Sequence, residues 1–201
     1  MTPRAARFTR NLVAAAGLFG ALALVPSAAT ADAPAPSNGQ ISVNVYSVPG
    51  SNTPKIVVRT VIQQPPRKVW AVVSDCAHYT SRLPRVAKSR LISKVGNVHT
   101  CEVTIAMPFP LSNLTAITQA THTESNGGMK RQWKLVSGDY TVNNGSWEIK
   151  PLDESGTASV VTYSVQAEPT TAVPAFVREQ AQKKALPELM ERVRAESAKI
   201  P

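Results

Sequence analysis

The sequence lacks the short motifs that mark the common classes of enzyme. Its 201 residues contain three histidines and two cysteines, and no two histidines have the spacing of metal ligands. A nucleophile elbow with its Ser/His/Asp pattern, a phosphate-binding loop and a dinucleotide fingerprint are also absent. We therefore predict no metal, no cofactor and no assigned catalytic residue from the sequence.

Long apolar runs are missing after residue 31. The one such run, residues 12–25, follows a basic start that ends at Arg10 and is closed by Pro26; small residues then stand at Ala29 and Ala31. Its length of about 14 residues is below the roughly 20 that a membrane-spanning helix needs. This pattern predicts a signal peptide over residues 1–31, cleaved after Ala31, and a periplasmic or secreted mature protein.

Cysteine is scarce, and the two that occur, Cys76 and Cys101, form an even pair. In an oxidising compartment such a pair is most simply a disulfide. Two alternatives stay open at this point: two buried free thiols, or a nucleophilic Cys76 assisted by His78.

Acidic residues are few, so the chain carries a formal net charge of +9. The basic residues are scattered, and their one compact cluster is Arg82, Arg85, Lys88 and Arg90. A solvated face explains such a cluster, and so does transient contact with an anionic membrane surface. Export argues against nucleic acid as a partner.

The order of β-rich and helical patterns predicts one α+β domain. After a flexible lead-in at residues 32–40 come two alternating strands, a short helix at 67–74, and five or six strands separated by turn residues. A long helical pattern follows at residues 173–200. We expect an antiparallel sheet of about seven strands with this helix along its concave face.

Two features of the long helical pattern are unusual. Pro187 lies inside it and should kink the helix. The middle of the apolar stripe is small, with Ala181 and Ala185 between bulkier residues at either end. Small residues facing a sheet either allow close packing or leave room for a ligand, and both interpretations stay open.

Several segments resemble the START-like superfamily, which includes polyketide cyclase/dehydrase and lipid-transport members. They are PPRKVWAVVSDCAHYTSRLPRV at residues 65–86, W-x-L-x-x-G-D at 133–139, G-S-W-E-I-x-P at 145–151, and Ala-Val-Pro at 172–174. The resemblance covers residues 41–199. It implies a START-like helix-grip domain, in which the sheet wraps around the C-terminal helix and an apolar cavity lies between them.

Aromatic residues make up only 5% of the chain, yet several fall in phase with aliphatic residues on successive strands. In a grip fold such residues are both core and cavity wall. The predicted ligand contacts, chosen by face and by position relative to the helix, are Tyr79, Met107, Trp133, Trp147, Tyr163, Phe176, Ala181 and Ala185. The apolar loop at residues 107–111 is either a rim of this cavity or a stiff turn packed on its own domain.

These observations favour an exported, monomeric carrier for a hydrophobic small molecule such as a lipid, sterol, quinone or polyketide-like compound. One alternative is a cyclase- or dehydratase-type enzyme that uses the same cavity, with an inward polar residue such as His99 or Tyr79. Another is a non-catalytic envelope interaction module with a filled core.

Overall fold

The structure, a computed structural model, describes residues 36–37, 39–51 and 53–201. The predicted signal peptide and its cleavage site lie outside the described residues, as does the first part of the lead-in. Among the described residues, no helix is long and apolar enough to cross a membrane.

Eight strands form one sheet in the spatial order β1-β2-β8-β7-β6-β5-β4-β3, and every neighbouring pair is antiparallel. The sequence predicted about seven strands, and the antiparallel α+β class is confirmed. The strands are β1 Ile41–Tyr46, β2 Lys55–Ile62, β3 Val86–Val95, β4 Val98–Ile105, β5 Leu114–Ser125, β6 Gly128–Gly138, β7 Tyr140–Pro151 and β8 Ser159–Pro169.

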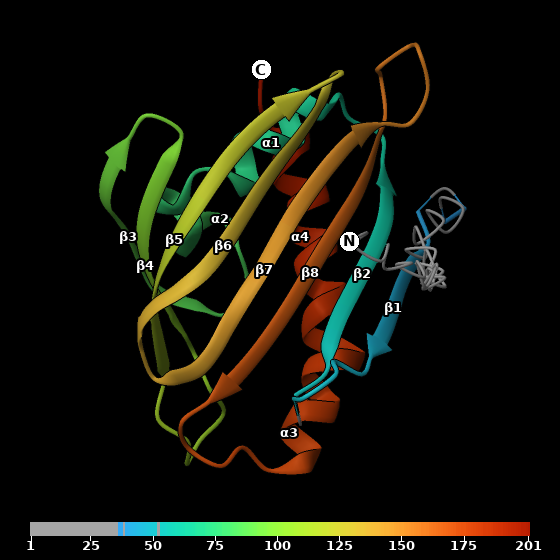
Figure 1. Ribbon diagram of the computed structural model, residues 1–201. Coiled ribbons are helices and arrows are strands. Elements are labelled where there is room, and N and C mark those ends of the chain that lie inside the picture. Colours follow the sequence, from blue (N-terminus) through green and yellow to red (C-terminus); the bar gives the residue numbers. More distant parts are fainter. Residues whose placement is uncertain (1–35, 38, 52) are drawn as a thin grey trace, which may run out of the picture. The chain divides into compact units, whose positions relative to one another are not determined.

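The chain reaches this order through hairpins and one long-range pairing. Strands β3 to β8 follow one another in space as they do in sequence, because each is joined to the next by a short connection. The first hairpin, β1–β2, instead pairs with the last strand, so that Val58 of β2 lies opposite Tyr163 of β8 (Figure 1).

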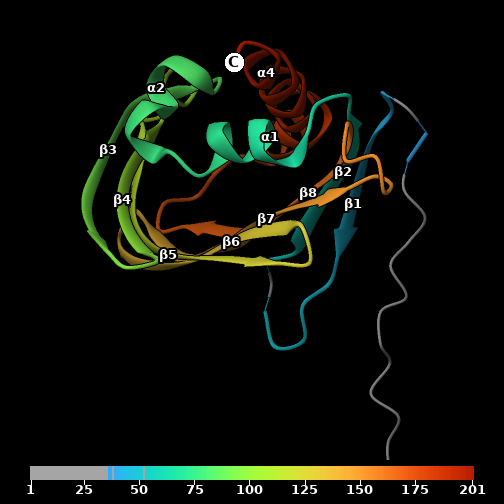
Figure 2. The same ribbon diagram turned by 90° about the horizontal axis from the view of Figure 1, so that it is seen from above.

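The helical segments lie on one face of the curved sheet (Figure 2). The short helix predicted after the first strands is present, and it begins at a proline, where the missing N–H is tolerated. The segments are α1 Pro66–Val73, η1 (a 3₁₀ turn) Cys76–His78, α2 Tyr79–Arg82, α3 Ala175–Gln180, η2 (a π-helical turn) Ala181–Ala185 and α4 Leu186–Ala198.

The long C-terminal helix is interrupted, where the sequence predicted one kinked helix. In η2 the backbone N–H of Leu186 donates to the carbonyl of Ala181, five residues back. Pro187 follows directly, and it has no N–H to offer the carbonyl four residues before it. The kink expected at Pro187 therefore takes the form of a π turn just before the proline.

The core lies between the concave face of the sheet and the helices α1 and α4. Its aliphatic side chains are fully or almost fully buried, and each such burial is worth about 1.5 to 3 kcal/mol. The set comprises Val58, Ile62, Ile149 and Val161 from the sheet, Val69, Val72 and Val73 from α1, and Met190 and Val193 from α4.

A disulfide joins Cys76 of η1 to Cys101 of β4, with 6.3 Å between the two Cα atoms. Both cysteines are buried. The disulfide predicted from the sequence is confirmed, and the alternatives of free thiols and of a nucleophilic Cys76 are wrong. An intramolecular disulfide is consistent with an oxidising compartment.

Candidate functional site

The concave face of the sheet is covered unevenly along its length. Helix α4 packs against α1, β1 and β2, whereas no described strand is in comparably close contact with α3 or η2. Apolar side chains on that part of the concave face are accordingly only half-buried. We call this part the half-covered region and define it by Val103, Ile105, Leu135, Val165 and Ala167.

Three of the predicted ligand contacts meet beside the half-covered region. The ring of Tyr163 lies 4.5 Å from that of Trp147 and 5.9 Å from that of Trp133, measured between centroids. The indole N–H of Trp133 donates to Oδ1 of Asn143 at 3.0 Å. Burial raises the pKa of the Tyr163 phenol, which is therefore neutral at physiological pH.

Tyr79 is buried on the helical side of the core, in α2. Its hydroxyl donates to the backbone carbonyl of Val73, and burial raises its pKa. The phenol thus already has a hydrogen-bond partner within the protein. Its ring is the part of Tyr79 that is turned towards the sheet, where it contacts the guanidinium of Arg131.

The other predicted contacts are spread more widely. Met107 and Ala185 are half-buried, whereas Ala181 is exposed and Phe176 is 67% exposed. Ala181 and Ala185 are the first and last residues of the π turn, and they differ in burial. Phe109, in the apolar loop after β4, is 97% exposed and is not packed on the domain. Contact of these residues with a ligand stays a prediction.

Arg131 is the most unusual side chain of the concave face, and it was not among the predicted contacts. It is only 4% exposed, and its guanidinium lies over the rings of Tyr79 at 5.8 Å and Trp133 at 5.7 Å. One sequence signal could have found it: Arg131 is two residues from both Met129 and Trp133, so strand alternation places it on their buried face.

Two histidines lie next to this arginine. His99 of β4 and His122 of β5 have ring centroids 4.0 Å apart, and the ring of Trp70 lies edge-on to His122 at 5.0 Å. Burial, followed by the nearby positive groups, lowers the pKa of both and brings that of His122 to about 4. His122 is therefore neutral at physiological pH and can accept or donate a hydrogen bond.

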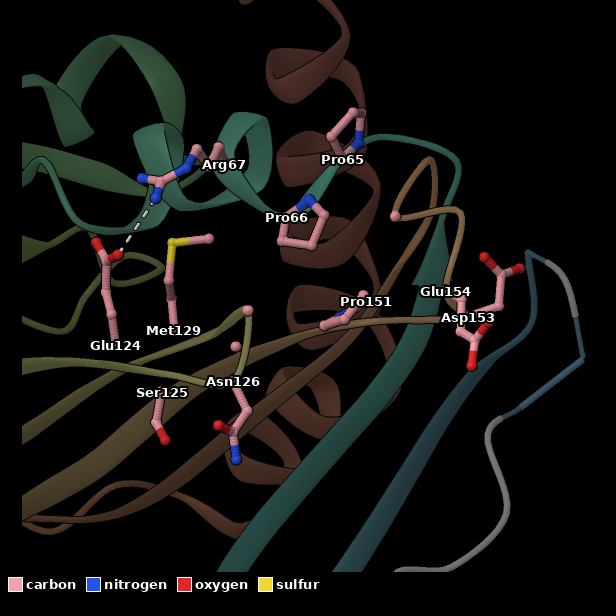
Figure 3. Close-up of a pocket in the computed structure, with 13 residues that line it drawn as sticks. Pro65, Pro66, Arg67, Glu124, Ser125, Asn126, Met129, Pro151, Asp153 and Glu154 are labelled. Carbon is pink, nitrogen blue, oxygen red and sulfur yellow. Dashed lines mark hydrogen bonds and ion pairs between the residues drawn. The ribbon is translucent and has the colours of Figure 1, made fainter.

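A surface hollow of about 600 Å³ lies at the end of the sheet where α1 begins (Figure 3). Arg67 and Glu124 form an ion pair on one side of it at 3.5 Å, and Asp153 and Glu154 border its other side. None of the eight predicted ligand contacts, all of them described residues, lines this hollow. Its lining combines apolar residues, among them Pro65, Pro66 and Met129, with the charged residues at its two sides.

Each residue of the basic cluster forms an ion pair within the domain, and three carboxylates are shared among the four cations. Arg82 pairs with Asp75 and Arg85 with Glu188, each at 3.1 Å. The remaining two, Lys88 and Arg90, both pair with Glu102, and their hydrogen bonds lower the pKa of Glu102 to about 2. Contact with a membrane surface stays a prediction that these ion pairs do not favour.

The sheet that wraps around the C-terminal helix, with an aromatic concave face beneath it, defines a START-like helix-grip domain. A model of the family described as polyketide cyclase/dehydrase and lipid transport matches residues 62–194. The chain belongs to this family.

Among the described residues, no group of three or more His, Cys, Asp or Glu side chains could hold a metal ion.

Solved structures show the same fold at low sequence identity. A STAR-related lipid transfer protein from Xanthomonas axonopodis aligns over 82% of this chain and 97% of its own, with a TM-score of 0.69 and 19% identity. Human STARD10 aligns over 82% of this chain and 72% of its own, with a TM-score of 0.70 and 19% identity. The Zhui aromatase/cyclase from Streptomyces sp. R1128 aligns over 74% of this chain and 95% of its own, with a TM-score of 0.59 and 12% identity. No curated protein matches significantly in sequence.

Proposed function

We propose that the protein is an exported, monomeric carrier that holds a hydrophobic small molecule between the concave face of the sheet and the helical segments α3 and η2. Lipids, sterols, quinones and polyketide-like compounds are the ligand classes that such a site suits. The half-covered region is the observation that carries the proposal. Apolar surface that the protein leaves partly uncovered on a concave face is surface that a ligand can cover.

The expected driving force is hydrophobic. A ligand that removes about 200 Å² of apolar surface from water gains about 5 kcal/mol before the entropy of binding is subtracted. Trp133, Trp147 and Tyr163 add flat, rigid surface, and the indole N–H of Trp133 already has its partner in Asn143. The family includes lipid-transport members, which supports a carrier, and the disulfide supports export.

Native mass spectrometry of the protein purified gently from its source tests the proposal directly. A discrete adduct that is lost on organic extraction supports a carrier and gives the mass of its ligand. A bare mass that persists after incubation with lipid extract contradicts it and favours the interaction module. A ligand whose mass changes in the presence of the protein supports the cyclase- or dehydratase-type alternative.

Two neighbouring residues of β6 provide a matched pair of variants. Leu135 lies opposite the buried Thr118 and is half-buried, whereas Val136, which has no register partner on β5, is 57% exposed. Leu135→Gln should weaken ligand binding about tenfold, because it places an amide against the ligand. Val136→Gln should bind as the wild type does. Equal binding by both variants would locate the ligand elsewhere.

A further inference from the structure

The buried guanidinium of Arg131 has no carboxylate partner. Among the described residues no ion pair includes it, and its one hydrogen bond runs from Nη2 to the disulfide sulfur of Cys101 at 3.5 Å, a weak acceptor. Its Nε is buried without any partner. A permanently charged group withdrawn from water in this way is costly unless an anion accompanies it.

A second unpartnered nitrogen belongs to the residue directly opposite Arg131 on the neighbouring strand. His122 of β5 is the register partner of Arg131 on β6, so the two side chains project from one face of the sheet at neighbouring points. Nε2 of His122 is buried and has no hydrogen-bond partner. These two atoms are the only buried side-chain nitrogens or oxygens left unpartnered in the described part of the chain.

The surroundings of this pair are aromatic or positively charged. His99, Trp70, Tyr79 and Trp133 supply rings. The groups whose charge acts on His122 are His99, Arg131 and Lys94, and none of them is an acid. The protein therefore supplies donors and positive charge here and does not supply the acceptor. That acceptor has to come from outside the chain.

We propose that Arg131 and His122 form the polar end of the ligand site and bind the carboxylate of an amphipathic acid. This inference rests on the proposed function, since the apolar body of the acid occupies the half-covered region. Along this face of β6, Met129, Arg131 and Trp133 are buried and Leu135 is half-buried, so the ring of Trp133 stands between Arg131 and the half-covered region.

The charge balance selects a carboxylate over a phosphate. One guanidinium neutralises one negative charge, and its planar edge matches the two oxygens of a carboxylate. A phosphate monoester carries about 1.5 to 2 negative charges at neutral pH and would need a second buried cation. Lys94 is exposed, and neutral His122 contributes a hydrogen bond without a charge.

A comparison of dodecanoic acid with dodecan-1-ol tests this inference, because the two probes share one apolar chain. Calorimetric titration at neutral pH should show that the wild type binds the acid about tenfold or more tightly. Arg131→Met should remove this preference and still bind the alcohol. Arg90→Met, which removes an exposed arginine paired with Glu102, should keep the preference.

The outcomes separate the inference from the proposed function. Equal binding of acid and alcohol by the wild type, or an acid preference that survives in Arg131→Met, overturns the carboxylate site and leaves the carrier standing. Failure of both probes to bind overturns the carboxylate site together with the hydrophobic site. If Arg131→Met does not fold, Arg131→Lys takes its place in the test. This variant keeps the charge and loses the planar edge of the guanidinium, so it should reduce the preference for the acid over the alcohol.

Discussion

The indole ring of Trp133 lies directly over Gly145, its register partner on β7. A Cβ atom added to Gly145 would stand 2.7 Å from Cη2 of Trp133, and closer still to Cζ2 and to the carbonyl oxygen of Ser164. No flexible side-chain end is available to move aside, because one neighbour is backbone and the other is a packed ring. The flat aromatic wall of the candidate site therefore depends on a glycine.

Replacement of this glycine should be severely destabilising. We expect Gly145→Ala to lower the free energy of unfolding by about 3 kcal/mol, through overpacking against Trp133 and the neighbouring strand. Gly156→Ala is the control: Gly156 has φ +63° but nothing within 4 Å of an added Cβ, so about 1 kcal/mol is expected. Urea unfolding measures both, and equal losses would contradict the steric account.

Loss of the disulfide should destabilise the domain by about 3 kcal/mol, because the bond between Cys76 and Cys101 closes a loop with a sequence separation of 25. The double variant Cys76→Ala/Cys101→Ala should unfold at a correspondingly lower urea concentration. Reductant should lower the stability of the wild type and leave the variant unchanged. A wild type that is insensitive to full reduction would show that the disulfide does not contribute.

Stability should fall as the pH falls from about 6.5 to about 4. The pKa of His122 is about 4 in the folded protein and near 6.5 in the unfolded chain, so over this interval the unfolded state binds the extra proton. Over this interval we expect the free energy of unfolding of the wild type to fall by about 1 to 2 kcal/mol more than that of His122→Gln. This difference is smaller than the full pKa shift implies, because the side chain is half-buried and solvent screens its charge.

Unfolding midpoints measured across this pH interval test the assignment. The difference between wild type and variant cancels the carboxylates, which titrate in both proteins. Parallel curves for wild type and His122→Gln would show that another group is responsible.

Arg194 should contribute more to stability than the other cations of α4. Its Nη2 donates to the hydroxyl of Thr60 at 3.0 Å and to the carbonyls of Gly39 and Val61, which ties the helix to β2. Arg194→Met should cost about 2 kcal/mol by urea unfolding. Lys199→Met, which removes an exposed pair with Glu196, should cost under about 0.5 kcal/mol. Similar losses would contradict a specific role.

Much of the fold was predictable because the sequence patterns are strong. Strand alternation placed Trp133, Trp147 and Tyr163 on one face, and the structure brings their rings together. The disulfide followed from the even number of cysteines and the expected compartment. The START-like resemblance, carried by the order of several individually weak motifs, is confirmed.

The π turn and the buried arginine were not predicted, for different physical reasons. A proline signals a missing N–H, but this signal does not distinguish a bend from a turn with one extra residue. Arg131 was passed over because a charged residue in a strand normally faces water. The position of Arg131 between Met129 and Trp133 predicts its burial only when those two residues are already known to face the core.

The pairing of β2 with β8 has a consequence for the order of folding. Val58 and Tyr163 are register partners although they lie more than a hundred positions apart in the chain. An isolated two-stranded hairpin is marginal in water, so β1–β2 gains its support only when the last strand arrives. Such non-local contacts form slowly. Until β8 is present, the first hairpin has no strand to pair with, and the eight-stranded sheet is completed only when the last strand joins β2 to β7.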